Sequence, residues 1–429
     1  MKHLKIFVLL SVVLVSIGVH GQSFDTYFVN KTLRLDYSFS GNARQQLIAV
    51  DQLNVMPGWY GKRRHLSEVP VEGNGQIIVR SHRDGEVIYA NSFSTLFQEW
   101  LTYDEAKTQT KAFENVFLVP MPKDTVDVTV TLRNNRREVM TQFTHTVVPT
   151  DILIKRIGES NVTPYQVVRK ADNPEKSIHV AFVAEGYTQA EMPKFIRDVE
   201  TATEAIFAHE PFKSMQGRFE VVAVKSPSID SGTSEPSKGV WRQTALQSHF
   251  DTFYSNRYLT TLRLRTLHNW LAGIPYEHII VLVNTAEYGG GGILNSYNLS
   301  MTDHVMFKPV VVHEFGHSLA GLGDEYAYES EALEMYPHDV EPWEPNITTL
   351  KDFDSKWKDM MEKDTPIPTP LSENPQTVMS RVGVFEGAGY SLKGVYRGCQ
   401  DCRMRTNTNP EFCPVCRRAL VRLIKFYTD

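Results

Sequence analysis

The hydrophobic pattern changes near residue 160, and this change sets the domain organisation. Up to about Thr150, apolar and polar residues alternate, as in GQIIVRSHRDGEVIYANSF (75–93) and DVTVTLRNNRREVMTQFTHTVV (127–148). Each segment carries turn residues near its middle, Arg83-Asp84-Gly85 in the first and Asn134-Asn135 in the second. Period-two alternation around a short turn is typical of an antiparallel hairpin. We therefore predict an antiparallel β-sandwich over residues 22–155.

From Ile178 onward, short apolar segments alternate with segments of helical periodicity. IHVAFVAEGYT (178–188), RFEVVAVKSPSID (218–230) and HIIVLVNTA (278–286) have the pattern of strands, whereas AEMPKFIRDVETATEAIFA (190–208) and LTTLRLRTLHNWLAG (259–273) repeat as helices do. Such alternation predicts a layered α/β domain with a mixed sheet over residues 160–429, so the whole chain is α+β. A length of 429 residues suits two domains of this size.

Composition places the chain among soluble globular proteins, with 41% hydrophobic and 22% charged residues. A net charge of -5 gives no basic surface of the kind that binds a phosphate backbone, so we expect no nucleic-acid partner. The one compact basic cluster, residues 62–65, we interpret as a solvated loop.

The first residues have the pattern of a secretory signal peptide. Lys2 and Lys5 precede an apolar run from Ile6 to Val15, and Val19 and Gly21 fit cleavage before Gln22. We predict a signal peptide over residues 1–21 and an exported mature chain without a membrane span, located in the periplasm, at the cell surface or in the medium. An uncleaved N-terminal anchor is the alternative.

The segment VVVHEFGHSLAGLGDEYAY (310–328) carries the strongest functional signal. On a helix, His313 and His317 lie one turn apart on one side, and the apolar residues Val311, Phe315 and Leu319 lie on the other. Two imidazoles four residues apart suit a zinc ion. Glu314 lies beside the pair, where its carboxylate can deprotonate a zinc-activated water. This spacing predicts one catalytic Zn²⁺ with Glu314 as general base.

A catalytic zinc needs a third protein ligand. Gly321 and Gly323 favour ending the helix, so we prefer Asp324, with Glu325 next. A chain that continues could instead supply a glutamate from a second helix, and Glu331 and Glu334 are the nearest candidates. A phenol near the metal, Tyr326 or Tyr396, is a candidate to stabilise the oxyanion.

HExxH followed by glycine and a third ligand is similar to the metzincin zinc peptidases, and HEFGHSLAGLGDEY resembles the IgA-peptidase family. The general metzincin spacing would place the glycine and the third ligand at Ala320 and Gly323, one residue before Gly321 and Asp324. The resemblance implies a methionine turn under the metal, at Met404 in CRMRTN. It also implies that the strand around 291–301 is an edge to which an extended peptide substrate adds.

Two CxxC pairs stand ten residues apart near the C-terminus, at Cys399, Cys402, Cys413 and Cys416. Their spacing fits either two disulfides or a structural zinc knuckle, and export favours disulfides. The sequence thus predicts a secreted zinc endopeptidase. An inert adhesion or glycan-binding protein and a zinc amidase acting on cell-wall material are the alternatives.

Overall fold

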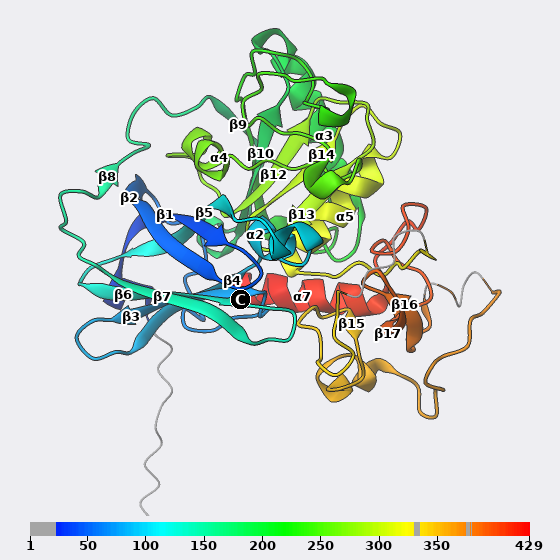
Figure 1. Ribbon diagram of the computed structural model, residues 1–429. Coiled ribbons are helices and arrows are strands. Elements are labelled where there is room, and N and C mark those ends of the chain that lie inside the picture. The colour runs from blue at the N-terminus through cyan, green and yellow to red at the C-terminus, as the bar shows by residue number, and fades with distance from the viewer. Residues whose placement is uncertain (1–22, 330–334, 375–377, 379) are drawn as a thin grey trace, which may run out of the picture.

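The computed structural model describes residues 23–329, 335–374, 378 and 380–429 (Figure 1). The predicted signal peptide lies outside these residues. Within them, no helix is long and apolar enough to cross a membrane.

Two four-stranded sheets form the N-terminal part. After the short helix α1 (Phe24–Tyr27), one sheet has the strand order β5-β1-β2-β8 and the other β4-β3-β6-β7. Their strands are β1 (Phe28–Gly41), β2 (Gln46–Pro57), β3 (Gly75–Ser81), β4 (Val87–Phe93), β5 (Lys111–Pro122), β6 (Val126–Arg133), β7 (Val139–Val147) and β8 (Lys155–Arg156), with α2 (Leu96–Trp100) between β4 and β5. The predicted hairpins β3–β4 and β6–β7 are both antiparallel. Only the two-residue strand β8 pairs in parallel, with β2.

Aromatic side chains join the two sheets in one core. The ring of Tyr37 in β1 lies 5.7 Å from that of His145 in β7, and Phe39 lies 6.3 Å from Phe93 in β4. Along β7, His145 lies between the exposed residues Thr144 and Thr146, which is the alternation expected of a strand with one buried face. In β1, by contrast, Tyr37 and Phe39 have only buried or half-buried neighbours.

The second part is built on a mixed sheet of order β13-β14-β12-β10-β11-β9. The strands β10 (Ile178–Glu185), β11 (Phe219–Val224), β12 (His278–Val283) and β14 (Tyr297–Met301) are parallel. The outer strands β9 (Tyr165–Arg169) and β13 (Gly290–Ile293) run antiparallel to their neighbours. The predicted mixed sheet is confirmed.

Both faces of this sheet are buried, which explains the uninterrupted apolar run of β10. The helices are α3 (Met192–Ala208), α4 (Leu264–Trp270), α5 (Phe307–Ala320) and α7 (Pro414–Thr428). Val180 and Phe182 pack in the core that includes α3, α5 and α7, whereas Ala181 and Val183 join the core shared with α4 and the N-terminal sheets. The predicted helix at 259–273 forms only over the seven residues of α4.

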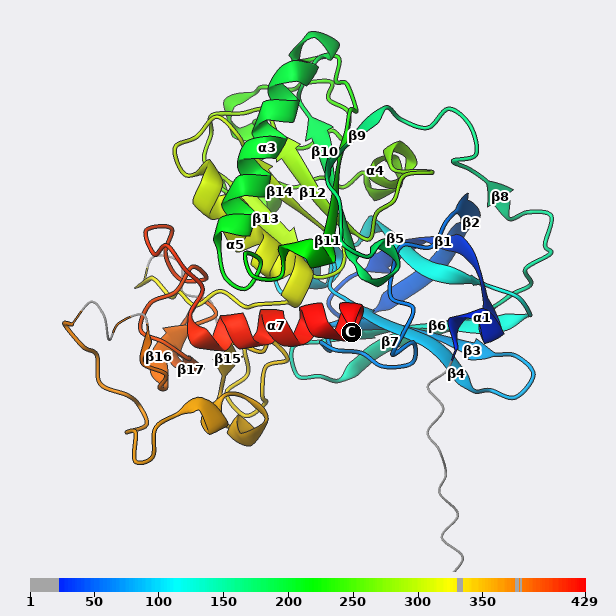
Figure 2. The ribbon, with the colours of Figure 1, turned by 180° about the vertical axis from the view of Figure 1, so that it is seen from behind.

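Helix α7 connects distant parts of the molecule (Figures 1 and 2). One end lies near the N-terminal sheets, and the other lies beside a small sheet of β15 (Ile347–Thr348), β16 (Phe385–Ala388) and β17 (Ser391–Arg397). At the first end, the Lys62 ammonium lies over the rings of Tyr89 and Phe426, and the residue as a whole is 3% exposed. The interpretation of residues 62–65 as a solvated loop is therefore wrong for Lys62, whose methylene stem packs while its ammonium donates to the carbonyls of His65 and Glu68.

Candidate active site

Helix α5 presents a polar side to a cleft and buries its apolar side. Val311, Phe315 and Leu319 are buried, as the helical spacing predicted. The side chains of His313 and His317 are 12% and 15% exposed, so they are reachable from the cleft. The helix ends at Gly321, whose φ of 60° is a left-handed conformation that suits glycine. The chain then turns back toward the histidines.

This turn brings Asp324 to the histidine pair. The Nε2 atoms of His313 and His317 are 2.9 Å apart, and Asp324 Oδ1 lies 3.1 and 3.3 Å from them. The ligand atoms of all three residues lie within 4.8 Å of one another. Tetrahedral ligands about 2.05 Å from a zinc ion would lie about 3.3 Å apart. The three groups are therefore spaced as ligands of one metal ion would be.

Backbone carbonyl groups orient both imidazoles. His313 Nδ1 lies 3.0 Å from the carbonyl oxygen of Arg403, and His317 Nδ1 lies 2.5 Å from that of Leu322. When Nδ1 carries the proton and donates it to a carbonyl, Nε2 is left as a lone-pair donor for a metal. Nε2 of His313 then points at Asp324 Oδ1, and Nε2 of His317 points at Nε2 of His313.

The electrostatics of the site favour a cation among these groups. Burial alone would raise the pKa of Asp324, but the nearby histidines hold it far below its ordinary value. Burial opposes the charge on His317, yet the Asp324 carboxylate outweighs it and raises the pKa of His317 to about 9. The field that favours a proton on His317 favours a divalent cation at the same point, and two nitrogens with one carboxylate oxygen are a donor set that zinc accepts.

Glu314 lies next to this group without being part of it. A Cβ atom on Gly290 would come within 2.7 Å of Glu314 Oε1, and one on Gly292 would meet the Glu314 backbone oxygen at 2.5 Å. These glycines let β13 lie directly against α5, which explains the glycine run in the sequence. Burial raises the pKa of Glu314 above its usual value, which is the direction that a general base working near neutral pH requires.

The remaining predicted site residues lie outside the histidine group. Met404 is buried under α5, where its sulfur would lie 2.9 Å from a Cβ on Gly316. Glu325, the second choice for third ligand, points away from the histidines and toward Cys416. Glu331 and Glu334 lie outside the described residues. All four cysteines are described, buried and present as free thiols, so the favoured disulfides are not found.

The site contains a tyrosine that the sequence did not single out. Tyr390 donates a hydrogen bond to Asp324 Oδ2 at 2.8 Å, and its hydroxyl lies 2.8 Å from that of Tyr326. Tyr326 also stacks near His313, with ring centroids 6.5 Å apart. Tyr396 pairs within the C-terminal sheet and is not among the described residues that line the cleft. Tyr390 lies in the turn between β16 and β17, and no motif in the sequence marks this turn as part of the site.

Comparison with known families identifies the chain. Residues 167–379 and 373–424 match the family described as IgA Peptidase M64, and residues 23–144 match the one described as Peptidase M64 N-terminus. The chain belongs to the IgA Peptidase M64 family. The search of curated proteins returned no match. Membership makes the chain a peptidase, and the matched region contains the histidines, Glu314 and Asp324.

The cleft of this peptidase has a volume of about 950 Å³ and is lined by both parts of the chain. His313, Glu314 and Asp324 line it, as do Gly290–Ile293 of strand β13. Glu99, from the N-terminal part, lines it as well and accepts a hydrogen bond of 2.5 Å from Tyr258. A substrate in this cleft would therefore contact both parts of the chain.

Glu99 should give the unfolding free energy a pH dependence. Burial raises its pKa to about 7, from 4.5 for an exposed glutamate. Between these values the folded chain keeps a proton that the unfolded chain has lost, so this contribution to stability is complete below about pH 4.5 and is lost as the pH rises through about 7. We expect the unfolding free energy to fall less between about pH 5 and 8 in Glu99→Gln than in the wild type, measured by denaturant titration. Equal slopes would contradict the assignment.

Proposed function

We propose that the protein is an exported, zinc-dependent endopeptidase with a metzincin-like catalytic domain over residues 160–429 and a β-sandwich domain over residues 22–155. One observation carries the proposal. His313, His317 and Asp324 converge at one point, with Glu314 beside them, in the cleft of a chain that belongs to a peptidase family. Export rests on the N-terminal sequence, with its two lysines and its apolar run.

His313, His317 and Asp324 are the residues that would hold the zinc ion. When bound, zinc would polarise the scissile carbonyl and make a water molecule easier to deprotonate at neutral pH. The carbonyl groups of Arg403 and Leu322 fix the two imidazoles, and Tyr390 fixes the carboxylate of Asp324. Because all three ligands have outer partners, they would bind the ion with little reorganisation.

Glu314 performs the proton transfers in this proposal. Its carboxylate takes the proton from the attacking water and delivers it to the leaving amine. Its place one residue from His313 puts it beside the ligands, and burial raises its pKa, which makes its carboxylate a stronger base than an exposed one. Tyr326 is the phenol beside His313 and is our candidate to donate a hydrogen bond to the oxyanion.

The substrate is proposed to be an extended polypeptide lying along β13. This strand is the last of the mixed sheet, so its outer edge is where a further strand would add. An isolated bridge between Tyr258 and Gly290 occupies the start of this edge. We therefore place the pairing with substrate along Gly291–Ile293. The rest of the predicted 291–301 edge belongs to β14, which lies inside the sheet and offers no free edge.

The test is cleavage mapping on a mixed library of unfolded peptides, with metal analysis of the same sample. We expect cuts within the peptides, loss of cleavage after chelation and recovery with Zn²⁺. Activity only on cell-wall amides would replace the endopeptidase by the amidase. Absence of all cleavage in a zinc-loaded sample would favour an inert binding protein.

Tyr390→Phe should weaken the site without removing a ligand. The variant loses the hydrogen bond to Asp324 Oδ2 and keeps the ring that packs against Tyr326. Loss of an outer partner of a metal ligand typically costs about 10–100-fold in affinity or activity. We expect a decrease of that size in zinc affinity, measured by chelator competition. Tyr328→Phe, at another tyrosine of the cleft wall, is the control and should keep the wild-type affinity.

A further inference from the structure

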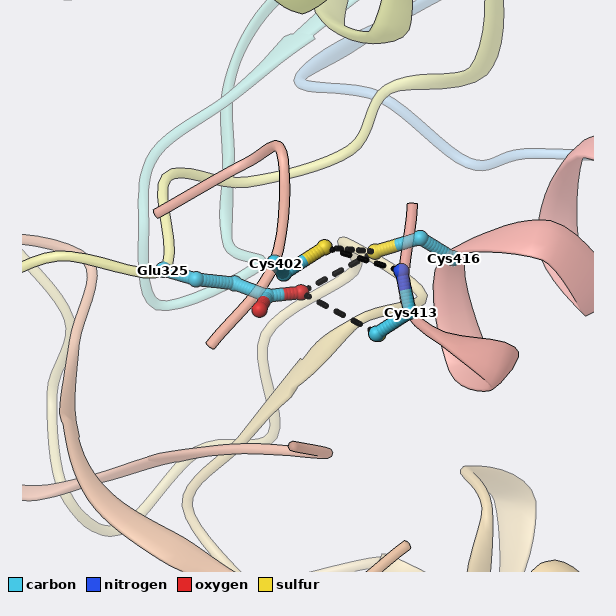
Figure 3. A group of neighbouring side chains, drawn as sticks. All are labelled: Glu325, Cys402, Cys413 and Cys416. Atoms are coloured by element: carbon cyan, nitrogen blue, oxygen red, sulfur yellow. Dashed lines mark hydrogen bonds between the residues drawn. The ribbon is translucent and has the colours of Figure 1, made fainter. Parts of the chain in front are cut away.

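A second group of candidate metal ligands lies at the start of helix α7. The ligand atoms of Glu325, Cys402, Cys413 and Cys416 all lie within 4.8 Å of one another, and all four residues are buried (Figure 3). The carboxylate reaches the sulfurs from the loop that follows α5, while the cysteines come from the C-terminal segment. This group shares no ligand with the histidine site.

The distance between two of the sulfur atoms suits a tetrahedral metal site. Sγ of Cys402 and Sγ of Cys416 are 3.7 Å apart. Thiolates bound to zinc at 2.3 Å would be about 3.8 Å apart, whereas a disulfide needs about 2.05 Å. Glu325 Oε1 lies 3.0 Å from Cys416 Sγ and 4.0 Å from Cys413 Sγ. A carboxylate oxygen and a thiolate on one zinc ion would be about 3.5 Å apart.

The burial of Glu325 calls for a positive charge at this position. Its side chain is 0% exposed, and Asn346 donates a hydrogen bond to Oε1. Oε2 has no hydrogen-bond partner among the described residues. The nearby guanidinium of Arg397 directs its hydrogen bonds to the carbonyl groups of Glu386, Gly387 and Gln400. A buried, ionised carboxylate among thiols is costly, and a cation bound by the group would remove that cost.

The local backbone also favours thiolates. Cys413 is the N-cap of α7 and Cys416 lies in its first turn, where the helix dipole stabilises negative charge. The N–H of Cys413 donates to Cys402 Sγ at 3.2 Å. This hydrogen bond holds the two CxxC segments together and brings their sulfur atoms close to one another.

We propose that Glu325, Cys402, Cys413 and Cys416 bind a second divalent metal ion, with zinc as the metal that this sulfur-rich set selects. The four protein ligands fill a tetrahedral shell, so the ion has a structural role. Cys399 is buried beside Cys413 but does not belong to the group of four. It stays a free thiol in this proposal.

This second metal would position parts of the catalytic site. Glu325 follows Asp324 directly, and its N–H donates to the carbonyl of Met404. The segment between Cys402 and Cys413 contains Met404 under Gly316 and Arg403, whose carbonyl oxygen contacts His313. An ion bound by Glu325 and these cysteines would fix the segment that carries Asp324 relative to the segment that carries Arg403 and Met404.

The test combines metal counting with cobalt spectroscopy on the full mature chain. We expect two equivalents of zinc in the wild type, and an intense thiolate-to-metal absorption in the near ultraviolet after exchange into Co²⁺. Cys416→Ser and Glu325→Gln should each lose one equivalent, and Cys416→Ser should lose most of this absorption. Cys399→Ser is the matched control and should keep both metals.

Three results would overturn the proposal. One is a wild-type chain with a single metal equivalent and no free thiols after denaturation, which would mean two disulfides. Another is a cobalt form of the wild type without thiolate absorption. This result does not depend on whether any variant folds. The last is loss of the metal in Cys399→Ser together with its retention in Glu325→Gln. Failure of the proposed peptidase site is seen separately, because Asp324→Ala should keep the thiolate absorption.

Discussion

Replacing Glu314 with glutamine is expected to lower kcat for peptide cleavage by about 10²–10⁴-fold and to leave the metal content unchanged. This is the usual contribution of a general acid–base residue. Glutamine has nearly the same shape, so the packing of α5 against Gly290 is kept. It cannot accept the proton of the attacking water. The three ligand residues are untouched, so the metal should stay bound.

The measurement is single-substrate kinetics beside elemental analysis of the same preparation. Glu329→Gln is a suitable control, because Glu329 also lines the cleft and is exposed. It should cleave at the wild-type rate. Undiminished cleavage by Glu314→Gln would remove Glu314 from the role of base, whereas loss of metal from that variant would mean that it acts as a ligand.

The histidine pair could be predicted from the sequence because its geometry is local. A spacing of four residues on a helix fixes where His313 and His317 point, whatever the rest of the chain does. The position of Asp324 is nearly as local, since it follows from the left-handed conformation of Gly321 that ends the helix. The choice between Asp324 and Glu325 was harder, because adjacent side chains in an extended loop point in opposite directions. Long-range contacts of Glu325 with Cys416 and Asn346 show which way each one points.

Features built by distant segments could not be predicted in the same way. Tyr390 reaches Asp324 only because Gly389 and Tyr390 pair with the backbone of Asp324 and Tyr326. The sheet of β15–β17 has a strand of two residues, which leaves no detectable period. Likewise, Lys62 sits in a polar sequence, yet distant aromatic rings bury it. The hairpins β3–β4 and β6–β7 were predictable because each forms within one continuous segment.

Asp324→Ala is expected to weaken zinc binding at the histidine site by more than about 100-fold. Loss of an outer-shell partner already costs about 10–100-fold, and this substitution removes a ligand together with the carboxylate that accepts from Tyr390. Two imidazoles alone leave zinc short of the three protein ligands that catalytic sites use. Cleavage should be lost with the metal and return in part at high zinc concentration, which distinguishes lost affinity from lost chemistry.

Chelator competition would measure the zinc affinity of Asp324→Ala, and Asp339→Ala would serve as a control at an exposed aspartate that pairs with Arg136. The control should bind zinc as the wild type does. Unchanged affinity in Asp324→Ala would assign the third ligand to another acid, and Glu331 and Glu334 would then be the next residues to replace. A decrease in zinc affinity would identify Asp324 as the third ligand. Glu325 is not a competing candidate, because its carboxylate is directed toward the cysteines.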